Sequence, residues 1–390
     1  MLIRYKINEQ GKQVAIAKVY TQQEHKIQPR SVDQNARFII ERLTKNGFKG
    51  YIVGGAVRDL LLQREPKDFD IATDASPKQI RKIFWNSRII GRRFKLVHIY
   101  FQEKIFEVST FRSCQNDPDS GNNVYGSIEE DAQRRDFTLN GLYFDPLGKR
   151  ILDFNDSYKD IKNRKMRSII PLNTTFVEDP VRMIRCVKYA VSTDFSIPFR
   201  LDRAIKKYAK EIRLCSSSRM TEEIFKILQS GNSQKIVERL MHYKLFVLML
   251  PEISGYIQHG KNRIITQELF KSLETLDFVI AKNRHVTRAR MLAGLVDPFI
   301  SIPDEYENSL MLFRSLFKQI KQIISPMTPP NYEVEKTVEY FFKHEGIKVP
   351  KNAVRKPTAM QSKKKPQQYR RWNNVKSNST KRRQKYPKLQ

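Results

Sequence analysis

Three acidic side chains in two short apolar segments could bind divalent metal ions. Asp68 and Asp70 are separated by Phe69, so on a strand both carboxylates would face one side while Phe69 turns into the core. Glu107 lies between apolar neighbours on a later candidate strand. Carboxylates held this close repel each other unless a cation neutralises them, and oxygen ligands suit Mg²⁺ or Mn²⁺. The pattern predicts a site for two such ions. Taken alone, D-x-D is a weak signal, because most matches are loop acids.

A pair of glycines upstream of these aspartates could approach a phosphate group. Gly54 and Gly55 follow a short apolar segment and precede a candidate helix, where backbone N–H groups can reach a triphosphate without obstruction by a Cβ atom. Arg58 would add a bidentate phosphate contact from the first helical turn. The spacing matches neither G-x-G-x-x-G nor the P-loop, so neither of those nucleotide folds is indicated. An ordinary turn is the alternative interpretation of the glycines.

Positioning these residues requires a compact α/β unit, and residues 49–153 have the pattern of one. A helix from Ser31, its expected cap, to Leu43 should precede the unit. Apolar alternation predicts strands at 51–53, 69–71, 97–101 and 105–111, with a helix at 56–62. After Pro171 the apolar spacing becomes helical, with helices expected at 178–191, 201–212, 219–228, 233–250, 266–281 and 306–324.

The composition indicates a polyanionic partner. The chain has 390 residues and a formal net charge of +31, which is typical of a protein that binds nucleic acid. A membrane surface is the rival explanation, but no apolar run approaches the ~18 residues that span a bilayer. The three cysteines show no C-x-x-C spacing, so neither a disulfide framework nor a zinc site is indicated. We therefore expect a reducing, cytoplasmic location.

The C-terminal segment differs sharply from the rest of the chain. From Gly346 onward it has fifteen Lys and Arg residues and no Asp or Glu, which makes it too polar to build a core. Interleaved aromatic residues suit base stacking beside phosphate contacts. We expect residues 346–390 to be a disordered, RNA-binding tail, although a solubilising tail is the alternative. The candidate RNA contacts there are Lys363, Lys364, Lys365, Arg370, Arg371, Arg382 and Arg383.

Four motifs in order resemble the class II tRNA nucleotidyltransferase and bacterial poly(A) polymerase family, over roughly residues 35–250. They are G-G-A-V-R-D-L-L-L at 54–62 with D-F-D at 68–70, R-R-D-F-T-L-N-G-L at 134–142, E-D-P-V-R-M-I-R at 178–185, and S-R-M-T-E-E-I at 218–224. The resemblance implies a polymerase-β-like palm with a five-stranded mixed sheet, followed by helical neck and body domains. On this basis we expect an N-terminal extension at 1–30, the palm at 31–173, a neck for base selection and RNA binding at 174–232, and the body at 233–345.

The resemblance also implies roles for individual residues. Asp68, Asp70 and Glu107 would be the catalytic, metal-binding carboxylates, and Gly54, Gly55, Arg58 and Arg135 would position the triphosphate. Asp136 and Asn140 would engage the ribose, while Asp179 and Arg182, on one helical face, would read the base. Arg112 is a further phosphate-contact candidate. For the charged residues, surface ion pairs remain the alternative.

Two activities share these motifs, namely poly(A) addition and repair of the tRNA CCA end. The segment G-R-R-F-K-L-V-H at 91–98 resembles the signature of bacterial poly(A) polymerases, with Arg92 and Arg93 as candidate contacts to RNA or triphosphate. The expected function is therefore ATP-dependent adenylation of RNA 3′ ends (mRNA, small RNA or tRNA) with two Mg²⁺ or Mn²⁺ ions and release of pyrophosphate. CCA addition is the alternative, and a non-catalytic RNA-binding protein is a third possibility.

Overall fold

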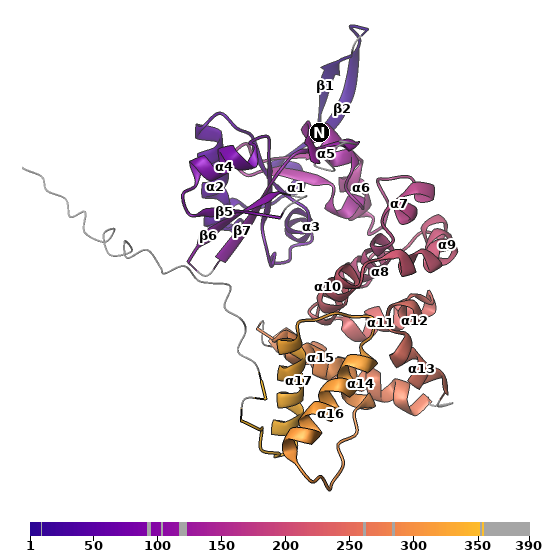
Figure 1. Cartoon of the computed structure of the whole chain (residues 1–390). Helices are drawn as coiled ribbons and strands as arrows, with labels where there is room; N and C mark the ends of the chain where they lie inside the picture. Colours follow the sequence, from indigo (N-terminus) through magenta and orange to yellow (C-terminus); the bar gives the residue numbers. More distant parts are fainter. Residues whose placement is uncertain are drawn as a thin grey trace, which may run out of the picture.

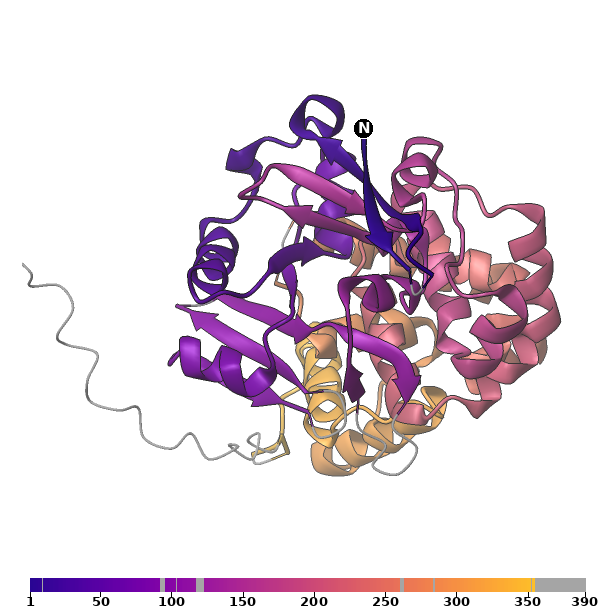
Figure 2. The same cartoon turned by 90° about the horizontal axis from the view of Figure 1, so that it is seen from above.

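The computed structural model describes residues 1–8, 10–91, 95–102, 104–116, 123–259, 263–282, 285–351 and 353–354. A β-sheet head forms the N-terminal part, and helices continue from it to a helical body below (Figure 1). Seen from above, the helices after residue 171 begin beside the sheet, and the last helices lie beneath it (Figure 2). None of the described helices is long and apolar enough to cross a membrane.

The head is built on one mixed sheet. In the described residues it has nine strands in the order β1-β2-β11-β10-β3-β4-β7-β6-β5, so the expectation of five strands is wrong. β4 and β7 run parallel, whereas their other neighbours are antiparallel. The strands are β1 (Leu2–Ile7), β2 (Gln13–Thr21), β3 (Gly50–Val53), β4 (Asp70–Thr73), β5 (Ser87–Ile90), β6 (Leu96–Phe101), β7 (Lys104–Thr110), β10 (Leu142–Asp145) and β11 (Arg150–Asp153), with β8 (Arg112–Asn116) and β9 (Asn123–Tyr125) in a separate pair.

The first thirty residues belong to the head rather than to a loose extension. β1 and β2 form a hairpin that projects from the head, and β2 pairs with β11 (Figure 1). Tyr20 stacks on Tyr158 with ring centroids 4.1 Å apart, which anchors the base of the hairpin. The sequence pattern did not indicate β1, because five of its six residues are exposed and the alternation of buried and exposed side chains that marks a strand is absent.

Two helices cover one face of the sheet. α2 (Gln34–Lys45) buries Ile39, Ile40 and Leu43, and α4 (Pro77–Ile83) packs on β5 and β6. The cap of α2 is Asp33, not Ser31, because its carboxylate accepts the backbone N–H groups of residues 35 and 36. The other helices of the head are α1 (Gln22–His25), α3 (Gly55–Leu61), α5 (Ile128–Gln133) and α6 (Ser157–Lys162).

Two of the expected helices differ from the structure where the chain breaks. The helix expected at 178–191 begins only at Val181, as α8 (Val181–Thr193), and the Asp179-Pro180 step separates it from α7 (Leu172–Glu178), which was not expected. Proline lacks the N–H that would continue α7. The 233–250 helix ends at His242, because Lys244 adopts a left-handed φ of 57° before a short helix at Leu245–Met249. The first break matters for function, because it places Asp179 outside either helix.

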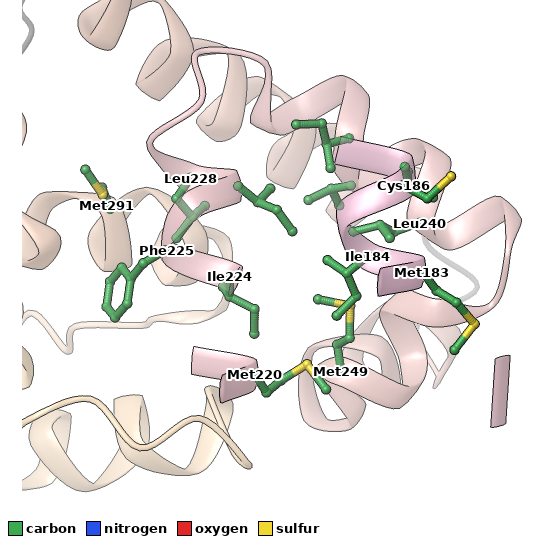
Figure 3. Packing of buried hydrophobic residues seen from close by; sticks show 14 of the residues in the cluster. Met183, Ile184, Cys186, Met220, Ile224, Phe225, Leu228, Leu240, Met249 and Met291 are labelled. Atoms are coloured by element: carbon green, nitrogen blue, oxygen red, sulfur yellow. The ribbon is translucent and has the colours of Figure 1, made fainter. Parts of the chain in front are cut away.

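The neck and body share one apolar core. Ile184 of α8 lies opposite Ile224 of α10, and Leu240 of α11 lies close to α8 (Figure 3). α13, α15 and α17 were not expected from the sequence. The helices of this region are α9 (Phe199–Tyr208), α10 (Ser217–Leu228), α11 (Ser233–His242), α12 (Leu245–Met249), α13 (Pro251–His259), α14 (Arg263–Lys282), α15 (Arg288–Val296), α16 (Ser309–Ile323) and α17 (Asn331–His344).

Candidate active site

The three candidate carboxylates converge on one cavity. Ile71 of β4 pairs with Val108 of β7 in the parallel ladder, so Asp70 and Glu107, one residue before each, lie side by side on the same sheet face. Asp68 precedes β4 in an exposed loop. All three line a cavity of about 970 Å³ between the head and the neck. The structure thus brings the three side chains to one cavity, but only Asp70 and Glu107 lie on strands, so the expectation that Asp68 shares a strand with Asp70 is wrong.

The electrostatics of Asp70 fit a cation-binding role. Its carboxylate opens to the cavity, but the surrounding protein displaces bulk water, and this desolvation, with repulsion from Glu107 and then Asp68, raises the pKa of Asp70 to about 6. In the described residues no three acidic, His or Cys side chains are already arranged to hold a metal ion. Carboxylates without a counter-ion repel one another, and their oxygen atoms are the ligands that Mg²⁺ takes. The residues therefore fit a divalent cation that draws them together.

This pKa leads to a prediction for metal binding. Because the proton and the cation compete for Asp70, Mg²⁺ or Mn²⁺ affinity without RNA or nucleotide should fall by about tenfold per pH unit below pH 6. With an ordinary carboxylate the decline would begin near pH 3.8 instead. Calorimetric titration with Mn²⁺ from pH 5 to 8 measures this, with Asp70→Asn as the comparison. A constant affinity between pH 5 and 6 would contradict the assignment.

The glycine turn lies directly against the carboxylates. Gly54 adopts a φ of +70°, and a Cβ atom placed there would lie 3.7 Å from Oδ2 of Asp70. A residue with a side chain would be strained in this conformation and would project toward the carboxylate. The first turn of α3 follows at once, and both Gly54 and Gly55 line the cavity. The backbone here is accessible to a ligand bound beside Asp70.

Arg58 is held in place before any ligand binds. Its Nε and Nη2 donate to Oδ1 and Oδ2 of Asp59 at 2.8 and 3.0 Å, and its Nη1 donates to Oδ1 of Asn140 at 3.0 Å. All three residues line the cavity. This double fixation gives the guanidinium one orientation, which is how a bidentate anion contact is pre-organised. Asn140 was expected to contact the ribose of the nucleotide. In the structure its side chain contacts Arg58, the residue expected to bind phosphate.

Arg135 belongs to a buried network centred on Asp131, a residue that the sequence reasoning missed. Asp131 Oδ2 accepts from Arg135 Nη2 at 3.0 Å and from the Tyr143 hydroxyl at 2.6 Å, while its Oδ1 accepts the backbone N–H of Arg112 at 3.2 Å. Burial alone would lower the pKa of Arg135, but Tyr143 and Asp131 outweigh it and raise that pKa. The network keeps a positive charge near Asp70.

Asp136 is paired within the protein. Its Oδ1 accepts the backbone N–H of Phe137 at 2.8 Å, and its Oδ2 lies 2.9 Å from Nη2 of Arg185. Arg185 also donates to the hydroxyl of Tyr189, one turn further along α8, at 3.0 Å. Asp136 lines the cavity as expected, but here it also joins the head to α8. Arg185 was not predicted as a site residue. It lies within the motif at 178–185 and three residues after Arg182, a spacing that places both side chains on one side of a helix.

Asp179 and Arg182 face the cavity from the opposite wall. Nε of Arg182 lies 3.9 Å from Oδ2 of Asp179, and Arg219 of α10 donates to the same Oδ2 at 2.9 Å. Among the described residues no donor reaches the buried Oδ1 of Asp179. The two residues do meet, although Asp179 lies in the break before α8 and not on a shared helical face. One carboxylate oxygen is thus anchored by Arg219, and the other is a buried acceptor that no donor of the described residues reaches.

Several candidate RNA contacts lie outside the described residues. They are Arg92, Arg93, Lys363, Lys364, Lys365, Arg370, Arg371, Arg382 and Arg383.

Comparisons with known proteins agree with this geometry. Residues 50–167 match the poly A polymerase head domain, and residues 194–257 match the probable RNA and SrmB-binding site of polymerase A. The chain is 36% identical to poly(A) polymerase I of Haemophilus influenzae over 282 residues, covering 69% of this chain and 62% of that protein. It is 34% identical to the CCA-adding enzyme of Staphylococcus aureus over 224 residues, covering 56% of each. The chain thus spans less than two thirds of the length of these curated relatives.

A solved structure extends the similarity to the helical part. The Bacillus stearothermophilus CCA-adding enzyme in complex with CTP superposes with a TM-score of 0.54 at 26% identity, covering 81% of this chain and 83% of that one. The sheet-borne carboxylates, the glycine turn and the helical neck are thus found in a chain that matches both groups of enzymes. The chain belongs to the class II tRNA nucleotidyltransferase and bacterial poly(A) polymerase family.

Proposed function

We propose that this protein is a template-independent RNA 3′-adenylyltransferase, a poly(A) polymerase that uses ATP and releases pyrophosphate. The proposal is based on one cavity that has acidic residues of the head on one wall and an acidic and a basic residue of the neck on the other. Asp68, Asp70 and Glu107 lie on the head wall, while Asp179 and Arg182 lie on the neck wall. A nucleoside triphosphate can contact both walls together, with its phosphates toward the carboxylates and its base toward the neck. A nucleic-acid template is not needed, because protein side chains can select the base.

The residues of the chain then have distinct roles. Two Mg²⁺ ions, held by Asp68, Asp70 and Glu107, would lower the pKa of the RNA 3′-hydroxyl and neutralise the leaving pyrophosphate. Arg58 and Arg135 hold the triphosphate, and both are already oriented by carboxylates. The Gly54-Gly55 backbone lets the phosphates approach the carboxylates closely, and Arg112 adds positive charge to the same wall. Asp136 and Asn140 would engage the ribose; Asn140 contacts Arg58, and Asp136 contacts Arg185 of α8.

Base selection should depend on Asp179. Asp179 and Arg182 both line the cavity, so the carboxylate can accept the adenine amino group while the guanidinium donates to a ring nitrogen. Asp179→Ala should lower kcat/KM for ATP by roughly 10- to 100-fold, the effect of one lost hydrogen bond to a charged group, and should reduce discrimination against GTP. Glu178→Ala is the matched control, because this neighbouring carboxylate also approaches Arg182, at 3.5 Å, but does not line the cavity. Equal losses for ATP and GTP in Asp179→Ala would contradict base reading.

Three features support poly(A) addition over CCA addition. The similarity to poly(A) polymerase I extends over 282 residues, compared with 224 for the CCA-adding relative. The G-R-R-F-K-L-V-H segment at 91–98 also resembles the poly(A) polymerase signature. The +31 net charge suits an enzyme that holds many RNAs through their phosphates without reading sequence. Such an enzyme would act in mRNA processing, in the cytoplasm where RNA and ATP are both abundant.

Incorporation of single labelled nucleotides tests the proposal. The purified full chain is given Mg²⁺, an unstructured RNA or a tRNA lacking its CCA end, and each nucleoside triphosphate in turn. Long tails from ATP alone support the proposal. Addition of two C and one A to the tRNA would replace it with CCA addition. RNA binding without any incorporation would leave only a non-catalytic RNA-binding protein.

The domain division remains part of the proposal. We assign catalysis to residues 31–173, base selection and RNA binding to 174–232, structural support to the body at 233–345, and RNA affinity to the basic tail at 346–390. The β1-β2 hairpin now joins the head as an extension of its sheet.

A further inference from the structure

One face of the outer sheet is open beside the catalytic carboxylates. The pairing aligns Arg88 of β5 with His98 of β6, and His98 with Glu107 of β7. The next row outward pairs Tyr100 of β6 with Ile105 of β7. Since side chains two residues apart on a strand share a face, both rows lie on the face that carries Glu107. The catalytic row thus continues across the sheet to its outer edge.

The two faces of these strands differ sharply in burial. Val97, Ile99, Phe106 and Val108 are buried on the face that α2 and α4 cover (Figure 1). On the other face Arg88 is exposed, and Tyr100 and Ile105 are 38% and 53% exposed. An exposed aromatic ring and an exposed aliphatic side chain directly opposite each other form a small flat apolar surface. We call these two residues, with His98, the β6–β7 platform.

The platform is connected to the active site by direct contacts. Nε2 of His98 lies 3.3 Å from Oε1 of Glu107. The His98 ring also meets Tyr100 edge-on, with ring centroids 6.3 Å apart and an interplanar angle of 76°, an arrangement that aromatic pairs favour. His98 therefore supports the Tyr100 ring on one side and touches a catalytic carboxylate on the other.

We propose that the β6–β7 platform is the stacking site for the nucleotides just upstream of the RNA 3′ end. This inference rests on the proposed function, which places the 3′-hydroxyl at the carboxylates. Alternate residues on a strand are about 7 Å apart, so Tyr100 lies about two stacked nucleotides, at 3.4 Å each, beyond the row of Glu107. The bases at these positions can stack on Tyr100 and pack against Ile105, whatever their sequence.

The charge of this face suits an RNA strand. Arg88 lies at the outer edge, on the last strand of the sheet, where it can meet the backbone phosphates of a strand whose bases stack on Tyr100. Lys95, directly before β6, lines the cavity and adds a positive charge at that end of the strand. Glu107 is the acidic residue within the two rows, and its charge is engaged by the catalytic cations. The platform suits RNA bases better than the base of ATP, because the proposed function places the base of ATP at Asp179, on the opposite wall of the cavity.

Binding measured without ATP tests the platform independently of catalysis. Oligoadenylates carrying one 2-aminopurine, at the first, second, third or sixth position from the 3′ end, are titrated with the full chain. Stacking quenches this fluorophore. We expect the strongest quenching at the second and third positions in the native protein, and its loss in Tyr100→Ala. Tyr100→Phe should retain it, because the ring is kept. Tyr306→Ala, which removes a similarly exposed tyrosine in the body, is the control.

Steady-state kinetics distinguish this site from the nucleotide site. Tyr100→Ala should raise the KM for RNA by roughly 5- to 150-fold, or about 1–3 kcal/mol, while the KM for ATP and kcat at saturating RNA stay within twofold. An unchanged RNA KM, or quenching that is the same in Tyr100→Ala, would overturn the platform. A higher KM for ATP instead would assign Tyr100 to the nucleotide. If the native protein incorporates no nucleotide, the proposed function fails, whereas position-dependent quenching would still establish the stacking site.

Discussion

Asp68→Asn should reduce AMP incorporation by about three orders of magnitude or more. Its carboxylate is one of three that converge on the cavity, and removal of a cation ligand forfeits several kcal/mol of charge stabilisation in the transition state, at 1.4 kcal/mol per tenfold in rate. Asp68 is the best member of the cluster to change, because it lies in an exposed loop before β4. The substitution keeps the size of the side chain and leaves the sheet pairing intact.

The loss should appear in catalysis and not in RNA affinity. Rates at saturating RNA and ATP measure kcat, and filter binding without ATP measures the RNA Kd, which should change less than threefold. Asp194→Asn makes the same chemical change at a carboxylate that is 86% exposed and pairs only with an exposed arginine among the described residues, and should leave kcat unchanged. Incorporation by Asp68→Asn within tenfold of the native rate would remove Asp68 from the catalytic cluster.

The carboxylate cluster could be predicted because it depends on local alternation. The alternation around Asp70 and Glu107 fixes the face of each of these side chains, whatever the strands pair with, whereas Asp68 lies in the loop before β4 and only its closeness in sequence to Asp70 could be used. The pattern does not show which strands pair with each other in the sheet. The parallel pairing of β4 with β7, which puts Asp70 beside Glu107, joins segments separated by α4, β5 and β6. The family resemblance supplied that link.

The contacts that orient the site could not be read from the sequence in the same way. Asp131 of α5 accepts a hydrogen bond from Arg135, four residues later in the sequence, and another from the hydroxyl of Tyr143, which lies on strand β10. Likewise, Arg185 of α8 meets Asp136 of the head only because the neck packs there. Both contacts depend on tertiary packing, which helical periodicity does not contain. The break between α7 and α8 has a local cause instead, because Pro180 lacks the N–H that would continue α7.

A buried ion pair joins the two neck helices at the wall of the cavity. Nζ of Lys188 in α8 donates to Oε2 of Glu223 in α10 at 2.9 Å, and Lys226 donates to Oε1 at 3.0 Å. The Lys188 and Glu223 side chains are 10% and 7% exposed, whereas that of Lys226 is 57% exposed. Burial would raise the pKa of Glu223, but Lys188 and then Lys226 outweigh it, so the pKa is lowered. The carboxylate is therefore charged and supports the helix that carries Arg182 and Arg185.

Glu223→Ala should cost about 3–5 kcal/mol in the free energy of unfolding, because it leaves the Lys188 ammonium buried without its partner. Lys226→Met removes only the exposed partner and should cost less than about 1 kcal/mol. Since a lowered carboxylate pKa gives stability that is lost on acidification, the difference between native and Glu223→Ala should shrink as pH falls below 4.5, the ordinary value. Urea unfolding at pH 7 and at pH 4 measures both effects.

A double variant separates the lost ion pair from the buried charge. Glu223→Ala combined with Lys188→Met should recover much of the lost free energy of unfolding, because no buried charge then remains. A Glu223→Ala cost below 1 kcal/mol, or no recovery in the double variant, would show that this pair does not hold α8 against α10.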